Sequence, residues 1–169
     1  LDSDLSSEIT LQPIKRFNLD SAIIFSDILI VPYALGQNVN FVKDQGPLLE
    51  NFNFEKFTNN NKITFTQKLQ PVYKAIEKTR KKLDKSKSLI SFIGAPWTLL
   101  IYMLGAKLNK NEIDFKKIEK SKFDINLILK TLNEYLCVHI DNQINSGADV
   151  VQVFDSWAGL LKVKDLPNY

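Results

Sequence analysis

The amino-acid sequence predicts an α/β fold with a parallel sheet. Three runs rich in branched apolar residues, at 22–30, 89–94 and 148–154, are typical of strands buried on both faces of such a sheet. Segments with helical spacing separate these runs, and each run carries polar or aromatic residues within it or directly after it. Because parallel strands end at the same edge of a sheet, we expect these residues to meet at one edge, where sites in such folds lie.

The first expected strand, at 22–30, carries Ser26 and Asp27 in its middle, and Pro32 is expected to close it. The polar residues 1–11 before it are expected to be the end of a helix. Burying an ionised carboxylate without partners costs several kcal/mol. Asp27 therefore either has structural partners or lies where the strand opens into a site, and its sequence context alone leaves both alternatives open.

A hairpin, a loop and a helix are expected between the first two strands. Residues 33–50 alternate weakly and contain Lys43-Asp44-Gln45-Gly46-Pro47, which indicates an irregular hairpin. Residues 51–66 include a run of asparagines and are expected to be loop. A helix is predicted from about Leu69, with a proline in its first turn and a basic run at its end that indicates a solvated C-terminus.

The second strand is expected to lead directly into a helix. The strand at 89–94 ends in Ala95-Pro96-Trp97, after which Thr98 is the expected N-cap of a helix that continues from Leu99 to Leu108. Tyr102 lies four residues after Thr98, so it is on the same side of this helix, one turn further along.

The clearest helical pattern precedes the third strand. After a short helix expected at 112–120, aliphatic residues recur at three- and four-residue steps over 124–145 and predict an amphipathic helix. Gly147 is expected to be the left-handed residue after its end. The strand at 148–154 then ends in Asp155-Ser156-Trp157-Ala158-Gly159.

Several conspicuous residues are given structural roles. His139 borders the apolar stripe of the long helix, away from any strand end, and is expected at the surface or in a second layer. Cys137 is expected to be a thiol without chemistry, and one histidine and one cysteine cannot form a metal site without further ligands. Trp97 and Trp157 are expected to be packing residues.

The composition excludes several classes of protein. The 169 residues suffice for one domain with a core, and a net charge of +3 is too small to indicate nucleic-acid binding. The only arginines are Arg16 and Arg80, and the single cysteine favours a reducing, cytoplasmic compartment. No apolar run has the length of a membrane span, and no glycine-rich dinucleotide loop follows a strand.

Three motifs together carry a resemblance to a known family. They are Phe25-Ser26-Asp27-Ile28-Leu29, Gly94-Ala95-Pro96-Trp97-Thr98 with Tyr102-Met103, and Val153-Phe154-Asp155-Ser156-Trp157-Ala158-Gly159. Gln12-Pro13 before a basic pair, and Gly46-Pro47, also fit. In this order and at this spacing, over nearly the whole chain, they resemble the uroporphyrinogen decarboxylase family.

The resemblance implies a partial (β/α)8 TIM barrel, comprising about its second to fourth strands with the intervening helices, as a single domain over residues 1–169. Family members are roughly twice as long. The chain, which begins with Leu1, is therefore expected to be a piece truncated at both ends. The family's Arg-Gln-Ala-Gly-Arg segment would precede Leu1 and its late histidine would follow Tyr169, so the piece alone is expected to be inactive.

The resemblance also implies an activity. The family converts uroporphyrinogen III to coproporphyrinogen III in porphyrin and haem biosynthesis by decarboxylating four acetate side chains, without a metal or an organic cofactor, often as a homodimer. Asp27 corresponds to the catalytic aspartate, the counter-ion of a protonated pyrrole that also accepts hydrogen bonds from pyrrole N–H groups. Tyr102 corresponds to a tyrosine beside the reacting acetate and Ser156 to a serine that binds a substrate carboxylate. Phe25 and Phe154 would be apolar walls against the macrocycle. No nucleic-acid or membrane partner is expected.

Each assignment has an alternative. Tyr102 would pack locally, Ser156 would cap a helix, Phe25 and Phe154 would belong to the core, and Asp155 is expected in a structural ion pair. Two other functions stay open. One is a corrinoid-dependent methyltransferase of the same barrel superfamily, with zinc ligands in later strands. The other is an inactive or binding fragment whose open strand edges leave it partly folded.

Overall fold

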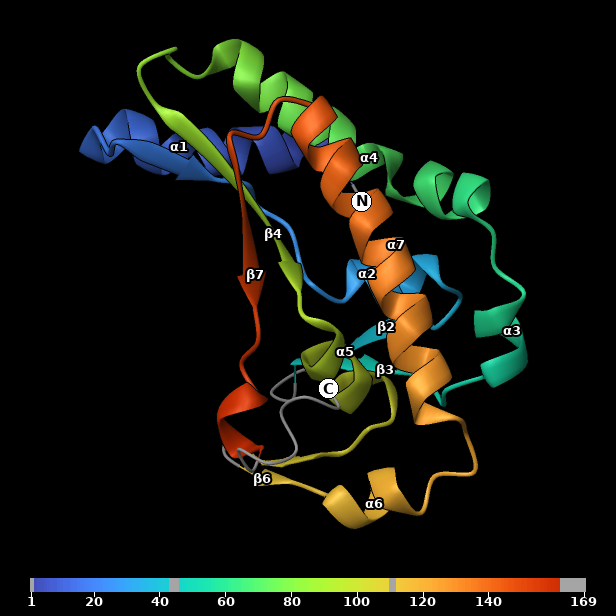
Figure 1. Ribbon diagram of the computed structural model, residues 1–169. Coiled ribbons are helices and arrows are strands. Elements are labelled where there is room, and N and C mark those ends of the chain that lie inside the picture. The colour runs from blue at the N-terminus through green and yellow to red at the C-terminus, as the bar shows by residue number, and fades with distance from the viewer. Residues whose placement is uncertain (1, 43–45, 110–111, 162–169) are drawn as a thin grey trace.

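The computed structural model describes residues 2–42, 46–109 and 112–161 (Figure 1). The helices are α1 (Ser3–Phe17), α2 (Ile30–Ala34), α3 (Phe54–Thr58), α4 (Lys62–Lys82), α5 (Pro96–Met103), α6 (Phe115–Glu119) and α7 (Ile125–Asn145), with a 3-10 turn, η1 (Ala158–Leu160). The strands are β1 (Ser21–Ile23), β2 (Val39–Val42), β3 (Gly46–Leu49), β4 (Ser88–Gly94), β5 (Lys107–Asn109), β6 (Glu112–Ile113) and β7 (Val150–Phe154).

The central sheet has three parallel strands in the order β1-β4-β7, which confirms the predicted α/β arrangement. Helices α4 and α7 pack along one side of it (Figure 1), and on that side Leu89 and Ile93 of β4 are buried. On the opposite face the side chains of Ile23 and Phe154 are 58% and 42% exposed. Burial on both faces is therefore a wrong prediction for β1 and β7, and the edge strand β7 is exposed on the helix side as well, where Val153, in register with Ile93, is 48% exposed.

The first strand is shorter than predicted. β1 ends at Ile23, and the ladder continues only through the Ile24 N–H, which donates to the Ile90 carbonyl at 2.9 Å. The chain then turns, and the branched residues after Asp27 enter the short helix α2, where Val31 is buried. Pro32 lies inside α2 and does not close the strand. A short apolar run in a buried turn and helix has the same composition as a buried strand, so composition alone does not distinguish them.

Side-chain caps mark the beginnings of three helices whose starts were not predicted. Asp2 accepts hydrogen bonds from the backbone of α1, which lower its pKa, so residues 3–11 are the start of that helix and not its end. The expected loop at 51–66 contains α3 and the start of α4, whose N-caps are Asn53 and Asn61. Pro71 consequently lies inside α4 and not in its first turn.

Helix α5 begins at Pro96, with Ala95 as its N-cap, and ends at Met103. The prediction of Thr98 as the N-cap is therefore wrong, and Thr98 lies within the first turn. The long helix is confirmed as α7, with Asp124 as its N-cap, and Gly147 after its end has a positive φ of 106° as predicted.

The predicted hairpin is confirmed in the antiparallel pair β2–β3, which joins Val39 to Leu49 and Val42 to Gly46. The expected turn at Lys43-Asp44-Gln45 lies outside the described residues. The short helix predicted at 112–120 is found only over Phe115–Glu119, as α6, because Glu112–Ile113 form β6 and pair with β5.

His139 is not a surface residue, because α7 buries a wider face than its aliphatic stripe. The ring is 1% exposed between α7 and α4, and its Nδ1 lies 3.0 Å from the Tyr73 hydroxyl. Phe65 and Tyr135 pack beside this pair. Cys137 is exposed on the same helix, so the two side chains do not meet a common site.

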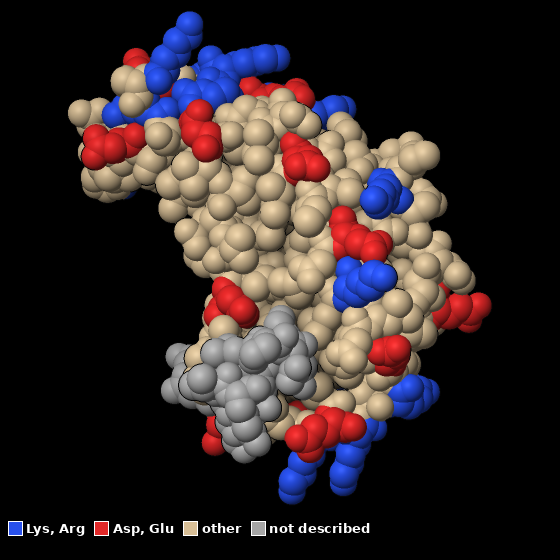
Figure 2. All heavy atoms as spheres, viewed as in Figure 1, with Lys and Arg blue, Asp and Glu red and all other residues tan. Residues whose placement is uncertain are grey.

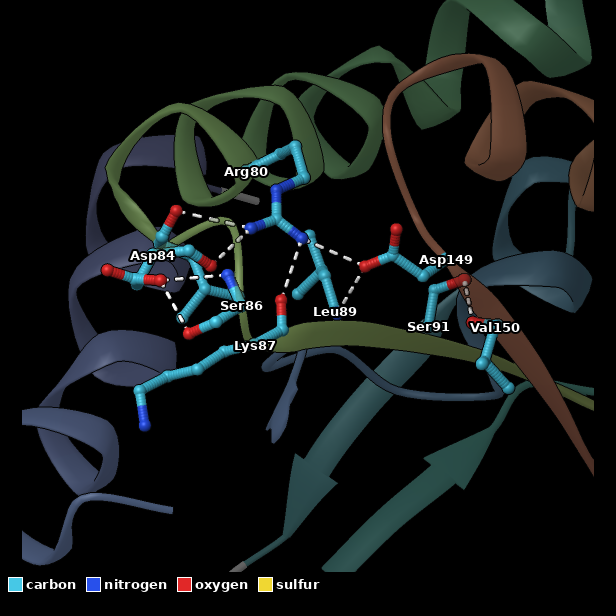
Figure 3. Close-up of polar contacts among 9 residues, drawn as sticks. Arg80, Asp84, Ser86, Lys87, Leu89, Ser91, Asp149 and Val150 are labelled. Atoms are coloured by element: carbon cyan, nitrogen blue, oxygen red, sulfur yellow. Dashed lines mark hydrogen bonds and ion pairs between the residues drawn. The ribbon is translucent and has the colours of Figure 1, made fainter. Parts of the chain in front are cut away.

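Arg80 joins the end of α4 to the amino ends of β4 and β7 (Figure 3). Its guanidinium donates to the carbonyls of Leu83, Asp84 and Lys87 at 2.8–3.1 Å and pairs with Asp149 at 2.8 Å. Asp149 also accepts the Leu89 N–H at 2.7 Å. The prediction of a solvated basic C-terminus for this helix is therefore wrong for Arg80. Its side chain anchors α4 to the edge of the sheet where the strands begin.

We expect Arg80→Lys to lower the free energy of unfolding by about 1–3 kcal/mol, because an ammonium cannot reproduce several directed hydrogen bonds of a guanidinium. Urea denaturation of the purified chain, followed by circular dichroism, measures the change. Lys81→Arg on the same helix is the matched control, since Lys81 is exposed and should tolerate the exchange within about 0.5 kcal/mol. Equal stability of the two variants would contradict the anchoring role.

Candidate functional site

The carboxyl ends of the three parallel strands lie side by side, as the sequence predicted. Gly94 at the end of β4 is in register with Phe154 at the end of β7. On the other side, a Cβ built on Gly94 would lie 3.1 Å from the Cβ of Ile28, which directly follows Asp27. The lack of a side chain at Gly94 therefore lets the Asp27 turn approach β4, and Gly94 links the turns of Asp27 and Ser156.

Asp27 lies in the turn after β1 and is partly buried. Its Oδ1 accepts the Leu29 N–H at 2.8 Å, so one of its oxygens has a structural partner. Asp27 also lines a cavity of about 500 Å³ with Phe25, Ser26 and residues of α1, α2 and α4, among them Tyr33. The structural alternative is thus confirmed, because Asp27 orders its own turn, and its place at a cavity is compatible with the prediction of a site.

Two hydroxyls of α1 fix the backbone just before this turn. Ser6 donates to the Phe25 carbonyl at 2.6 Å, and Thr10 accepts the Phe25 N–H at 2.9 Å. Thr10 also donates to the Ser6 carbonyl at 2.7 Å, so its hydroxyl is used in both directions. This pair joins residues up to 19 positions apart in the sequence, and no local pattern indicates it.

Phe25 and Phe154 are not core residues. Phe25 is 58% exposed at the cavity beside Asp27, whereas Phe154 is 42% exposed on the open face of the sheet, where it contacts Phe92 edge-on at 5.5 Å. Figure 2 shows that the side of the molecule between α1 and the end of β7 is hollowed and largely without charge. Exposed aromatic side chains suit contact with the apolar part of a ligand.

Ser156 is exposed in the turn between β7 and η1 and caps no helix, because the N-cap of η1 is Trp157. Tyr102 of α5 is half-buried with its ring 6.2 Å from the ring of Trp157, which brings it beside this turn. Lys107 lies on the same tyrosine, with its Nζ 5.8 Å from the ring centroid. The structure therefore places Tyr102 against the residue that follows Ser156, and it adds a cation that the sequence did not single out.

The cavity beside Asp27 is not lined by Tyr102, Ser156 or Phe154. Those three residues lie at the ends of β4 and β7, where the face is open. The candidate site thus consists of two neighbouring groups of residues, joined through Gly94 and Ile28.

Asp155 is not in the expected ion pair. The Thr98 hydroxyl donates to its Oδ1 at 2.7 Å, and the described salt bridges do not include it. Trp97 and Trp157 are 1% and 5% exposed, which confirms their packing roles, and the Trp97 Nε1–H donates to the Trp157 carbonyl at 3.2 Å.

Nowhere in 2–42, 46–109 or 112–161 do three or more histidine, cysteine or carboxylate side chains gather closely enough to hold a metal ion. In the same ranges no helix is both long enough and apolar enough to cross a membrane.

The fold and the site define an α/β protein with its candidate site at the carboxyl edge of a parallel sheet. The family model described as Uroporphyrinogen decarboxylase (URO-D) matches residues 1–169, and the chain belongs to this family. It is 43% identical to a protein named uroporphyrinogen decarboxylase from Rickettsia bellii (strain RML369-C), over 99% of this chain and 50% of that protein. It is 46% identical to the protein of the same name from Orientia tsutsugamushi (strain Ikeda), over 97% of this chain and 48% of that protein. The chain spans about half the length of the curated relatives it matches.

Among solved structures, a methyltransferase from Methanosarcina mazei superposes on 91% of this chain and 46% of its own, with a TM-score of 0.65 and 15% sequence identity. At this identity the likeness concerns the fold alone.

Proposed function

We propose that this chain supplies part of a uroporphyrinogen decarboxylase, which converts uroporphyrinogen III to coproporphyrinogen III by removing carbon dioxide from four acetate side chains. The observation that carries the proposal is the family match over residues 1–169. It is supported by the position of Asp27, Tyr102 and Ser156 at the ends of three neighbouring strands.

Within that enzyme the chain would form about the second to fourth strands of a (β/α)8 barrel. The parallel order β1-β4-β7, the helices on one face and the exposed apolar side chains on the other support this position. Further β/α units would pair with the outer edges of β1 and β7 and enclose the face that carries Ile23 and Phe154. We use the term complete protein for this chain together with those further β/α units.

The residues have distinct roles in the proposed reaction. A proton added to a pyrrole makes the ring cationic, and the electron pair of the breaking C–C bond neutralises it as carbon dioxide leaves. The methylene that remains then takes a proton to become a methyl group, and the ring returns its extra proton. A fixed Asp27 carboxylate in a site shielded from water would stabilise the cation better than solvent does. Tyr102 and Ser156 would donate hydrogen bonds to substrate carboxylates.

A methyltransferase function has the support of fold likeness only. It would require ligands from segments outside this chain. It is distinguished from the decarboxylase by its need for a bound metal.

The test is a decarboxylation assay of the complete protein. Incubation with uroporphyrinogen III under nitrogen, followed by oxidation and chromatography of the porphyrins, should give coproporphyrin III. Residues 1–169 alone should give none, because they lack the remainder of the site. Unchanged substrate with the folded complete protein would refute the decarboxylase, and product from residues 1–169 alone would refute the requirement for the rest of the barrel.

A further inference from the structure

The side chain of Thr98 lies between the two residues that flank Ser156. Thr98 is in the first turn of α5 and is 0% exposed. Its hydroxyl donates to the Asp155 carboxylate at 2.7 Å and accepts the backbone N–H of Trp157 at 3.3 Å. A hydroxyl has a single proton to donate, so both of its functions are used on one turn.

Two further bonds tie this turn to the start of α5. The Ala95 N–H donates to the Phe154 carbonyl at 2.8 Å, and the Trp97 indole N–H donates to the Trp157 carbonyl at 3.2 Å. The backbone is therefore held on both sides of Ser156. The Ser156 side chain itself is exposed, and none of the hydrogen bonds found within the described residues uses its hydroxyl.

The same helix carries the second residue of this group. Tyr102 lies one turn after Thr98, and its ring packs against Trp157. A movement of the Ser156 turn relative to α5 would thus change the distance between the hydroxyls of Ser156 and Tyr102. The bonds from Thr98 oppose that movement.

We infer that Thr98 is a positioning residue, which fixes the Ser156 hydroxyl relative to Tyr102 so that both reach one carboxylate of the ligand. The identity of that ligand rests on the proposed function, whereas the hydrogen bonds that hold the turn do not. Displacing a binding group by about 1 Å costs up to about 100-fold in rate. The buried Thr98 hydroxyl therefore determines how well the exposed Ser156 hydroxyl binds the ligand.

Thr79 provides the comparison for a purely structural threonine. It is also 0% exposed, but its hydroxyl donates to the Ala75 carbonyl of its own helix at 2.7 Å. Thr98→Val and Thr79→Val remove the same atoms from equally buried positions. Only the first variant frees the turn around Ser156.

The first measurement uses the chain itself and needs no substrate. Hydrogen exchange followed by NMR should show the Trp157 amide exchanging at least about 10-fold faster in Thr98→Val than in the wild type. Thr98→Ser, which keeps the hydroxyl, should restore slow exchange, and Thr79→Val should leave this amide unchanged. An unchanged Trp157 amide in Thr98→Val overturns the inference.

The second measurement is a double-mutant cycle in the complete protein. Thr98→Val should lower kcat/KM for uroporphyrinogen III by about 10- to 100-fold, mainly through KM, and Thr98→Ser should recover most of it. Combined with Ser156→Ala, Thr98→Val should have little further effect, because the group it positions is gone. Fully additive losses overturn the positioning role. An inactive wild-type protein refutes the proposed function but leaves the exchange result to decide whether Thr98 holds the turn.

Discussion

Asp27→Ala in the complete protein is expected to lower kcat for uroporphyrinogen decarboxylation by at least about 10²- to 10³-fold, while KM changes far less. The reason is that the carboxylate would interact most strongly with the ring when the ring is cationic, which occurs only on the way to the transition state. The turn that holds Asp27 is fixed from both sides, by its own bond to Leu29 and by the hydroxyls of Ser6 and Thr10 on Phe25. Such a preorganised group needs little reorientation as charge develops.

Asp27→Asn separates charge from shape. The amide oxygen can still accept the Leu29 N–H, so the turn is retained while the negative charge is lost, and kcat should remain close to that of Asp27→Ala. Asp124→Asn is the matched control, since Asp124 makes the same kind of bond to a backbone N–H, that of Leu127 at 3.0 Å, far along the chain at the start of α7. Steady-state kinetics of the three variants decide the role. If Asp27→Asn has wild-type kcat, Asp27 orders its turn and stabilises no cation.

The ends of β4 and β7 could be predicted from the sequence, because each apolar run stops at a clear change of residue type. The length of β1 could not. Residues 22–31 are apolar apart from Ser26 and Asp27, yet they divide into a strand, a turn and the start of α2, and the apolar residues of the strand and of the helix are of the same kinds. The asparagines at 53 and 61 show the converse error, since residues typical of loops became helix caps.

The hydroxyls that hold the site were beyond prediction for another reason. Thr98 meets Asp155 across 57 positions of sequence, and Ser6 meets Phe25 across 19. Their contacts arise from the packing of α5 and α1 against neighbouring strands. The hydrophobic periodicity within a single helix or strand does not predict such contacts. A partial signal existed for Thr98, because Pro96 favours the first helical position and thereby places Thr98 inside the helix.

The second large effect concerns stability. We expect the free energy of unfolding of the chain to fall by about 3 kcal/mol between pH 7 and pH 4 through His139 alone. Burial between α4 and α7 lowers the pKa of His139 from its usual 6.5 to about 4 and raises the pKa of its partner Tyr73. Nδ1 of the neutral His139 ring accepts a hydrogen bond from the Tyr73 hydroxyl or donates one to it, depending on the tautomer. A protonated ring could only donate.

The direction follows from proton binding in the two states. In the unfolded chain His139 takes up a proton as the pH falls through about 6.5, whereas in the folded chain it stays neutral until about 4. Between these values the unfolded state binds more protons, so acid favours it. Each unit of difference in pKa corresponds to about 1.4 kcal/mol, and above about pH 7.5 the histidine contributes no pH dependence.

Urea denaturation at several pH values between 7.5 and 4.5 measures this effect, because His139 is the only histidine in the sequence. The double variant Tyr73→Phe/His139→Leu removes the titrating group without leaving its partner unpaired in the core. Carboxylates titrate in both proteins, so the difference between their pH profiles isolates the histidine. The wild type should lose stability relative to the double variant as the pH falls from 7 to 4.5. Parallel profiles would mean that His139 is protonated at its ordinary pKa, and hence that α4 and α7 do not bury it.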